Sequence, residues 1–346
     1  WQTVQPRRIL LSAPTGRAAR KLQESVGSIF AGSGDLEART LHSCLSRNQG
    51  LDRYELIIVD EVFMIDSALM TRFWTALRDD GCQKVVFLGD PDQLPPVGAG
   101  RLLKDWLKGQ GGLDLGKQRV HLSQGYRSSN DLFAAFEKLR KGDKAWSDRL
   151  QRIPDSPSCM KILDDQHRSG IFHWDIDFKS AVEVQELCEC WLKNWFNSEV
   201  GNDTVRSALG QSELDHQQLQ ALLSSLGVSK ILTATRFGIT GSESLNERLR
   251  RLLAERLKAG KEKFFHGVPV MVTRNQEAKT LFNGDMGICL KQSGKAKEGA
   301  SRVRVYFPGG RVADPHGQGE MVPSFSMTVH KSQGGEYRHV ILLMSA

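Results

Sequence analysis

The sequence contains little cysteine and no long apolar run. Six cysteines occur among 346 residues, and none of them shows the paired spacing typical of a zinc site. In a chain this long and this poor in cysteine we expect no disulfide framework, which fits a reducing cytosol. No apolar run reaches ~18 residues and no signal peptide opens the chain, so we expect no membrane partner and a cytoplasmic location.

Two cysteines and two tryptophans share one apolar stretch. Cys188 and Cys190 are separated by one residue, while Trp191 and Trp195 are four residues apart, which places both indoles on one face of a helix. A hydrophobic core explains this pattern better than a metal site or a base-stacking platform. We therefore predict that all four side chains are buried.

The composition is that of a globular chain with a slightly basic balance. Hydrophobic residues make up 40% and charged residues 25%, which excludes a disordered or fibrous protein. The length allows two to four compact units. The 47 Lys and Arg against 40 Asp and Glu favour a polyanionic partner such as nucleic acid, although many enzymes share this balance.

Short apolar runs alternate with helix-like stretches in the first third of the chain. Residues 7–16, 54–61 and 84–90 are such runs, each ending in turn or acidic residues. This alternation predicts an α/β fold with a parallel sheet that is buried on both faces. In such sheets, ligands bind beyond the carboxyl ends of the strands.

The pattern of apolar and polar residues changes further along the chain. Residues 128–225 are more polar and more helical than the first third, and an apolar run at 230–237 leads into a helix-like segment at 244–260. From 264 to 322, short β segments broken by Gly and Asn indicate a small barrel-like insertion. A helix-like piece and a strand follow. No internal repeat has a fixed period.

Two acidic residues follow the apolar run LIIV. Asp60 stands at the predicted strand tip, where its carboxylate can hold Mg²⁺ through water, and Glu61 can polarise a water for attack on a γ-phosphate. The alternative is a strand that merely ends in solvated acids. Gln93 follows the next run, VVFLGD, and its neutral amide can sense a γ-phosphate without adding charge. Its position one strand later distinguishes the segment from an ordinary proline-rich turn.

Nine motifs occur in the order found in one family of helicases. They are LSAPTGRAARKL, TLHSCL, IIVDEVFMID, FLGDPDQLPPVGAG, LSQGYRSS, SLNERL, GVPVMVTRN, LFNGDMGI and SMTVHKSQGGEY, and they span residues 11 to 337. The chain therefore resembles the RecD-type DNA helicases of superfamily 1, and within that family the alpha subunits of exodeoxyribonuclease V.

The resemblance implies two RecA-like P-loop NTPase lobes with parallel sheets. The first lobe is expected at residues 1–123, and the second at 124–263 and 323–346. Residues 264–322 are similar to the SH3-like β insertion of the second lobe. Within that insertion, Asn283-Gly284-Asp285 is expected to form a tight hairpin turn.

The resemblance also assigns roles in the binding of ATP and Mg²⁺. Asp60 resembles the Mg²⁺ ligand, Glu61 the catalytic base and Gln93 the γ-phosphate sensor. Arg127 resembles the arginine finger that stabilises the transition state, the alternative being a local ion pair with Asp131. The family motif that couples the nucleotide cleft to the single-strand track matches Gln333, Gly334 and Glu336.

A further set resembles the residues that line the single-strand track of the family. It consists of Thr15, Gly16, Thr40, His42, Thr328, His330 and Lys331. Hydroxyl, imidazole, ammonium and backbone amide groups can grip phosphates without reading bases, as sequence-tolerant translocation requires. The alternatives are a capping or packing role for His42 and a solvated helix start for His330 and Lys331.

The chain departs from the family in its phosphate-binding loop. No G-x-x-x-x-G-K-[ST] loop precedes the APTG segment, and the arginine motif expected after HKSQG is absent. Residues 111–118 match the Gly and Lys spacing but end in Gln118 where Mg²⁺ needs Ser or Thr, so we interpret them as a surface loop. We expect an internal piece of a longer reading frame, with little ATP hydrolysis by itself. The short gap at residues 46–53 predicts no full-sized strand-separating hairpin.

The resemblance implies that the parent protein is an ATP-dependent helicase moving 5′→3′ on single-stranded DNA. In an exodeoxyribonuclease V complex it would act on duplex DNA with RecB- and RecC-like subunits, in recombinational repair of double-strand breaks. Two alternatives are the RecD-like motor of a conjugative relaxase and a non-catalytic DNA-binding remnant. The presence of Asp60, Glu61, Gln93 and Arg127 together argues against a remnant, because a binding module needs no γ-phosphate sensor.

Overall fold

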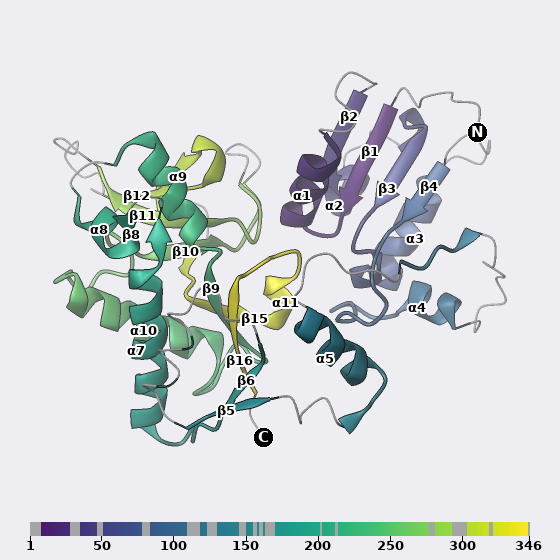
Figure 1. Cartoon of the computed structure of the whole chain (residues 1–346). Helices are drawn as coiled ribbons and strands as arrows, with labels where there is room; N and C mark the ends of the chain where they lie inside the picture. Colours follow the sequence, from purple (N-terminus) through teal and green to yellow (C-terminus); the bar gives the residue numbers. More distant parts are fainter. Residues whose placement is uncertain are drawn as a thin grey trace. The chain divides into compact units, whose positions relative to one another are not determined.

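The computed structural model of the chain describes residues 8–27, 35–46, 51–77, 84–108, 118–122, 130–144, 150–154, 158, 162, 170–200, 203–211, 214–276, 281–292, 303–317 and 321–344. The chain divides into two compact units, Trp1–Gln124 and Gly125–Ala346 (Figure 1). None of the helices in the described ranges is long and apolar enough to span a membrane.

A four-stranded parallel sheet organises the first unit. Its order is β2 (Asp35–Thr40), β1 (Arg8–Ala13), β3 (Leu56–Val59) and β4 (Lys84–Phe87), as Figure 1 shows. Ser12 pairs with Val59, and Val59 pairs in turn with Phe87. The carboxyl ends of β1, β3 and β4 are therefore level with one another. The predicted α/β fold with a parallel sheet is confirmed.

Burial is uneven across this sheet. Leu10 and Leu11 of β1 are fully buried, as predicted for a strand covered on both faces. Val86 of β4 and the following Leu88 are 41% and 39% exposed. The prediction of burial on both faces is wrong for β4, because among the described strands it has a neighbour on one side only.

The helices of the first unit are short. The apolar spacing of RAARKLQESV predicted a helix, and α1 (Gly16–Gly27) confirms it. The remaining elements are α2 (Leu41–Ser46), η1 (Leu51–Arg53), η2 (Val62–Met64), α3 (Ser67–Thr75) and α4 (Leu102–Leu107). The turn η2 and helix α3 follow β3 without a long loop, so the chain turns sharply at Asp60 and Glu61.

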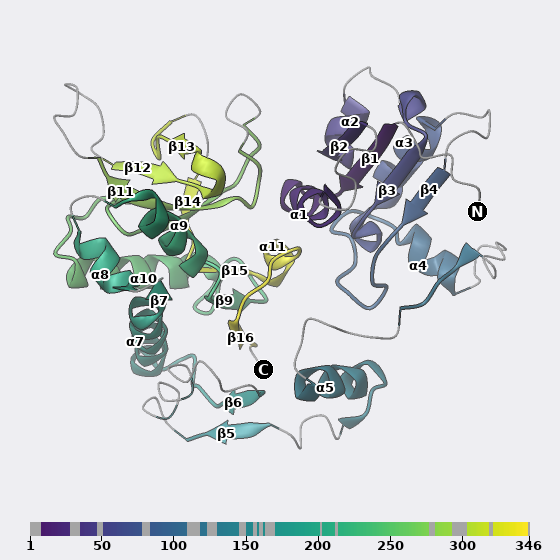
Figure 2. The same cartoon turned by 45° about the horizontal axis from the view of Figure 1, so that its top comes forward.

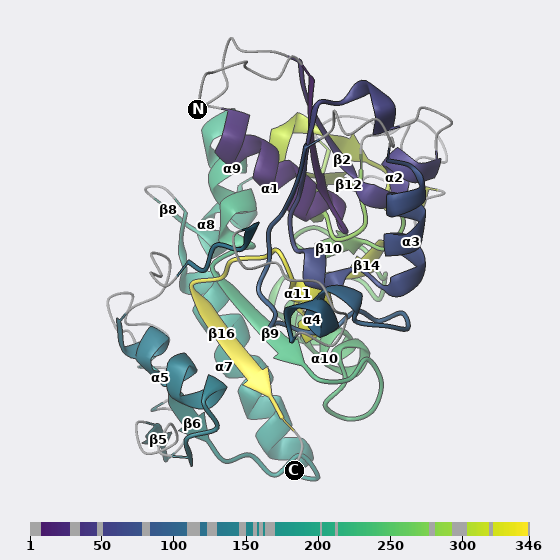
Figure 3. The same ribbon diagram turned by 90° about the vertical axis from the view of Figure 1, so that its right-hand side faces the viewer.

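A second parallel sheet lies in the second unit. Its order is β15 (Ser326–Thr328), β9 (Ser229–Thr233) and β16 (His339–Leu343), and Figure 3 shows β16 beside β9. Thr328 pairs with Thr233, so β15 and β9 end at the same level. The helix α10 (Ser242–Arg256) packs against α7 (Ala181–Asn197) and β15. Both helices and β9 lie where the sequence predicted them.

The predicted core residues of α7 are buried. Trp191 and Trp195 are 2% and 1% exposed, and their rings stack with centroids 6.0 Å apart. Cys188 and Cys190 are buried free thiols, and burial raises the pKa of the Cys188 thiol to about 12. The prediction that these four side chains belong to a hydrophobic core is confirmed.

An antiparallel sheet follows α10 in the second unit. Its order is β13 (Val312–Ala313), β12 (Val303–Tyr306), β11 (Met286–Lys291), β10 (Pro269–Val272) and β14 (Met321–Pro323) (Figure 2). The predicted short β segments are confirmed, while an SH3-like fold stays a prediction. Asn283 and Gly284 form a tight turn, in which the Asp285 N–H donates to the Phe282 carbonyl (3.0 Å). This turn is not the tip of the β10–β11 hairpin, because the bridge that Leu281 makes lies farther out.

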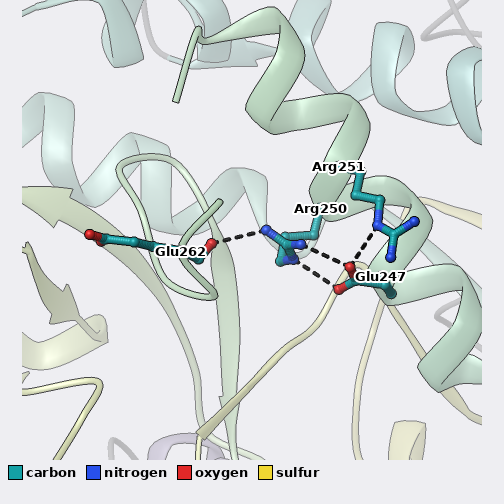
Figure 4. A network of polar contacts seen from close by, with 4 residues as sticks. All are labelled: Glu247, Arg250, Arg251 and Glu262. Atoms are coloured by element: carbon teal, nitrogen blue, oxygen red, sulfur yellow. Dashed lines mark hydrogen bonds and ion pairs between the residues drawn. The ribbon is translucent and has the colours of Figure 1, made fainter. Parts of the chain in front are cut away.

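A polar network fastens the middle of α10 to the segment that follows the helix. The Arg250 guanidinium donates to both carboxylate oxygens of Glu247 (2.8 and 2.9 Å) and to the Glu262 carbonyl (2.9 Å) (Figure 4). Arg251 donates to the same carboxylate (2.8 Å). Arg250 is only 8% exposed, so its charge is compensated by these partners.

The other elements of the second unit are shorter. The apolar spacing of FAAFEKLRKG, residues 133–142, is typical of a helix, and α5 (Asn130–Arg140) covers most of it. The others are β5 (Gln151–Ile153), β6 (Phe172–Trp174), β7 (Glu199–Val200), β8 (Asp203–Thr204), α8 (Val205–Gly210), α9 (His216–Ser225), η6 (Pro308–Gly310) and α11 (Val329–Ser332).

Candidate active site

The backbone at the end of β3 fixes the direction of the Asp60 carboxylate. The Asp60 N–H donates to the Ser12 carbonyl (2.9 Å), which extends the pairing with β1 by one residue. Asp60 Oδ1 then accepts from the Glu61 N–H (2.8 Å). The carboxylate is therefore held at the strand tip instead of rotating freely.

Glu61 has a left-handed backbone conformation, with φ 51° and ψ 38°. Lys258 is the other residue besides glycine with a positive φ in the described ranges. A side chain in this region costs ~1–2 kcal/mol, so the surrounding bonds must hold it there. The Val62 N–H donates to the Leu88 carbonyl and the Met64 N–H to the Glu61 carbonyl (3.0 Å each). Local strain thus coincides with the predicted catalytic base.

Gln93 lies in a tight turn after β4. The Asp92 N–H donates to Asp90 Oδ1 (2.9 Å) and the Gln93 N–H to the Asp90 carbonyl (3.2 Å). The Gln93 side chain is exposed, and with Phe63 it lines a shallow hollow. Because β3 and β4 are adjacent and parallel, the Asp60–Glu61 and Gln93 segments leave the same edge of one sheet.

The loop after Gln93 is attached to the start of α3. Asp66 caps this helix by accepting from the Leu69 N–H (2.8 Å), and the Ser67 N–H donates to the Ala99 carbonyl (3.1 Å). A Cβ at Gly98 would lie 2.2 Å from the Asp66 carboxylate. A β-carbon therefore does not fit there, which gives one glycine of PPVGAG a steric role. Sequence reasoning assigned no role to Asp66.

The three threonines among the residues expected to contact DNA occupy equivalent positions in the fold. Each stands at a junction where a parallel strand passes into a helix. Thr15 Oγ1 accepts from the Ala18 N–H (3.3 Å) at α1, and Thr40 Oγ1 accepts from the Ser43 N–H (3.2 Å) at α2. Both hydroxyls therefore cap helices, and each keeps its own O–H as a donor.

The neighbours of these threonines lie at the same ends of their strands. Gly16 is the first residue of α1, and His42 is exposed on α2. In the second unit, Thr328 is the N-cap of α11, which makes no side-chain cap bond, and His330 and Lys331 are exposed on that helix. Partial desolvation by neighbouring groups, and next the positive charge of Arg236, lower the pKa of Lys331, while Glu243 opposes the shift.

The residues expected to form the coupling motif follow α11 directly. The Gln333 Nε2 is buried and has no hydrogen-bond partner within the described part of the chain. Gly334 has a positive φ of 71°, and the Gly335 N–H donates to the Ser332 carbonyl (2.8 Å). Glu336 is exposed. The motif is therefore a tight turn between α11 and β16.

Asn246 fixes the strand that leads to Thr328 and the other residues expected to contact DNA. Its Oδ1 accepts from the Phe325 and Ser326 N–H groups (2.8 Å each), and its Nδ2 donates to the Ser326 carbonyl (3.0 Å). α10 thereby holds the start of β15, whose end carries Thr328. The SLNERL motif contained this residue, but its spacing gave no sign of partners 79 and 80 residues away.

Some predicted residues lie outside the described ranges. Arg127 is among them, as are residues 111–117 of the segment that mimics a phosphate-binding loop.

Asp60 is suited to Mg²⁺, although the described residues contain no group of three or more His, Cys, Asp or Glu that could hold a metal. Mg²⁺ in nucleotide sites uses one or two carboxylates together with waters and phosphate oxygens. A single oriented carboxylate at a strand tip therefore matches the donors that this ion requires from the protein.

Sequence comparisons place relatives along almost the whole chain. Residues 1–156 match the family described as AAA domain. Over 97% of this chain, the sequence is 26% identical to the RecBCD enzyme subunit RecD of Haemophilus influenzae and 27% identical to that of Mycolicibacterium smegmatis. The resemblance to the RecD-type helicases is confirmed. The ATP-dependent RecD2 DNA helicase of Deinococcus radiodurans is 27% identical over 96% of this chain.

The RecD-type relatives are longer than this chain. It spans 57% of the two RecD subunits and 38% of the RecD2 helicase. Among solved structures, the chain is similar to the Pif1 helicase from Bacteroides in complex with ADP-AlF3 and ssDNA, with 15% identity and a TM-score of 0.44. That match covers 99% of this chain and 84% of the other.

Proposed function

We propose that this chain is the motor region of an ATP-dependent DNA helicase that moves 5′→3′ on single-stranded DNA. The observation that carries the proposal is the position of Asp60 and Glu61 directly after β3, with Gln93 in the turn after the adjacent strand β4. The RecD-type relatives support it, because one of them is named as an ATP-dependent DNA helicase.

The residues at this edge have roles that their chemistry allows. Asp60 offers Mg²⁺ an oriented carboxylate oxygen. Glu61 orients an attacking water and accepts its proton, and Gln93 senses the γ-phosphate with a neutral amide. Bound ATP with Mg²⁺ supplies the phosphoryl group. The motifs found in the chain provide these side chains of the site, but not the phosphate-cradling loop.

The strand-end threonines and their neighbours form the proposed DNA contacts. Thr15 and Thr40 offer hydroxyl donors in the first unit, as Thr328 does in the second, and Lys331 offers a cation. Such groups bind the phosphate backbone and not base edges, which suits a motor that moves along any sequence. Arg127 remains the proposed finger, and Gln333 to Glu336 the proposed coupling motif.

The wider assignment follows the RecD subunits. We place the protein in an exodeoxyribonuclease V complex with RecB- and RecC-like subunits, acting in the cytoplasm on DNA with double-strand breaks. Two RecA-like lobes, with the antiparallel sheet as an SH3-like insertion, remain the proposed organisation. The printed names of the RecD relatives as subunits of the RecBCD enzyme support these partners.

The proposal predicts that the complete gene product hydrolyses ATP and that single-stranded DNA stimulates this hydrolysis. Glu61→Gln removes the base and should lower kcat about 100-fold, with KM for ATP nearly unchanged. Gln93→Ala should lower the DNA-stimulated kcat about tenfold, because the sensor amide is lost. Steady-state phosphate release with and without an oligonucleotide measures both effects.

The matched control is Glu24→Gln, which removes an exposed carboxylate from α1 and should leave hydrolysis unchanged. Hydrolysis that survives in the Glu61→Gln protein contradicts the assigned base. If the wild-type protein binds single-stranded DNA without hydrolysing ATP, the DNA-binding remnant is the better account.

A further inference from the structure

A loop between β9 and α10 displays two apolar side chains at the surface of the second unit. Phe237 is 65% exposed and Ile239 is 54% exposed, although large apolar side chains usually pack inside. Neither residue belongs to the sets assigned above. The loop, residues 234–241, begins at the carboxyl end of a parallel strand, where ligand-binding segments occur in such sheets.

Hydrogen bonds hold this loop in one shape. The Thr235 hydroxyl donates to the Phe237 carbonyl (3.0 Å), and the Gly241 N–H donates to the Gly238 carbonyl (3.1 Å). Ser242 and Glu243, at the start of α10, donate back to loop carbonyls (3.2 and 3.1 Å). A Cβ at Gly241 would lie 2.4 Å from the Phe237 backbone, so the loop closes tightly here. The exposure of Phe237 is therefore built into the fold.

A cation lies against the Phe237 ring. The Arg236 guanidinium is 5.0 Å from the ring centroid, and its Nε donates to Glu243 (2.6 Å). The Arg236 side chain nevertheless remains 59% exposed, so it can still meet an anion from solvent. An aromatic ring beside an arginine is the combination that binds stacked bases and their phosphates.

The loop is adjacent to the segment proposed to grip DNA. Thr233, directly before the loop, pairs with Thr328. The positive charge of Arg236 lowers the pKa of Lys331, which places the two cations within electrostatic reach of each other. The aromatic ring and the proposed phosphate-binding groups therefore follow the carboxyl ends of two adjacent strands, β9 and β15.

We propose that Phe237 is a stacking platform for a base of single-stranded DNA, with Arg236 and Lys331 at the flanking phosphates. This inference rests on the proposed function and names a base contact that the phosphate-binding set lacks. Two apolar side chains among cations offer far less surface than the ~800 Å² per partner that a stable protein interface buries. A nucleotide of single-stranded DNA fits this group, because its base matches the size of the ring and its phosphates match the two cations.

The test compares binding of the 346-residue chain to a dT20 oligonucleotide and to an abasic strand of equal length. Fluorescence anisotropy at low salt should show about tenfold weaker binding of dT20 by Phe237→Ala, with the abasic strand nearly unaffected. Phe237→Trp should keep the wild-type affinity for dT20, because it preserves the stacking surface.

Phe136→Ala is the matched control, since Phe136 is a 49% exposed phenylalanine on α5 of the same unit and should leave both affinities unchanged. If Phe237→Ala weakens the binding of dT20 and of the abasic strand equally, or weakens neither, the stacking role is overturned. If the wild-type chain binds neither strand, the proposed DNA contacts themselves fail, which is a separate outcome.

Discussion

At the scale of single residues, Glu61 joins two properties that seldom coincide. It carries the predicted catalytic carboxylate, and its backbone adopts a conformation that favours glycine. Lys258 adopts the same conformation after α10, where the Ala259 N–H bonds back to the Ala254 carbonyl (2.8 Å) in an ordinary helix ending. Only at Glu61 does a chemical role explain why a glycine is absent.

Replacing Glu61 by glycine should therefore stabilise the fold and abolish hydrolysis. Relief of the left-handed strain exceeds the extra entropy of the unfolded glycine by roughly 0.5–1 kcal/mol. Urea denaturation of Glu61→Gly measures the gain in the free energy of unfolding. Lys258→Gly should give a similar gain with hydrolysis intact. A loss of stability in Glu61→Gly, beside a gain in Lys258→Gly, would refute the claim of strain at this site.

Single residues also show what a sequence can reveal. Asp60, Glu61 and Gln93 could be found because each follows an apolar strand, and the parallel sheet brings such ends together. Asn246 could not be found from spacing, because the backbone groups that it bonds lie in a strand far along the chain. Phe237 carried no recognisable pattern, since exposure is a property of the folded loop.

At the scale of elements, apolar runs and helical spacing predicted most of the described fold. β1, β3, β4 and β9 lie on the predicted runs. β2 was missed because its sequence, DLEART, is polar, as an end strand of the sheet can be. β15 was missed because three residues are too short for a recognisable alternation, and Asn246 holds them in place instead.

The network in the middle of α10 should make stability depend on acid pH. The hydrogen bonds from Arg250, and to a lesser extent those from Arg251, lower the pKa of Glu247 from 4.5 to about 2. The folded state thus binds fewer protons than the unfolded state between these values. The stabilisation is present above pH 4.5 and is lost as the pH falls towards 2.

Glu247→Gln should therefore cost about 0.5–1 kcal/mol of unfolding free energy at pH 6, a modest value because the carboxylate is 45% exposed. The difference in unfolding free energy between this variant and the wild type should shrink as the pH is lowered to 2.5. Denaturant titrations at several pH values measure it. Glu255→Gln, on the same helix, should show no such trend, and a difference for Glu247→Gln that stays constant with pH contradicts the network.

At the scale of the whole molecule, the chain contains two compact units, each with its own parallel sheet. The proposed catalytic carboxylates lie in the first, and the coupling motif lies in the second. The length allowed two to four compact units, and the two RecA-like lobes expected from the motif order stay a prediction. The RecD-type relatives span the same two units and extend beyond them in length.

The most direct test of the motor assignment is strand displacement by the complete gene product on duplexes with one single-stranded tail. The account predicts ATP-dependent unwinding of a duplex with a 5′ tail, little unwinding with a 3′ tail, and none by the Glu61→Gln protein on either. Preference for the 3′ tail, or equal unwinding by the wild-type and Glu61→Gln proteins, would contradict it.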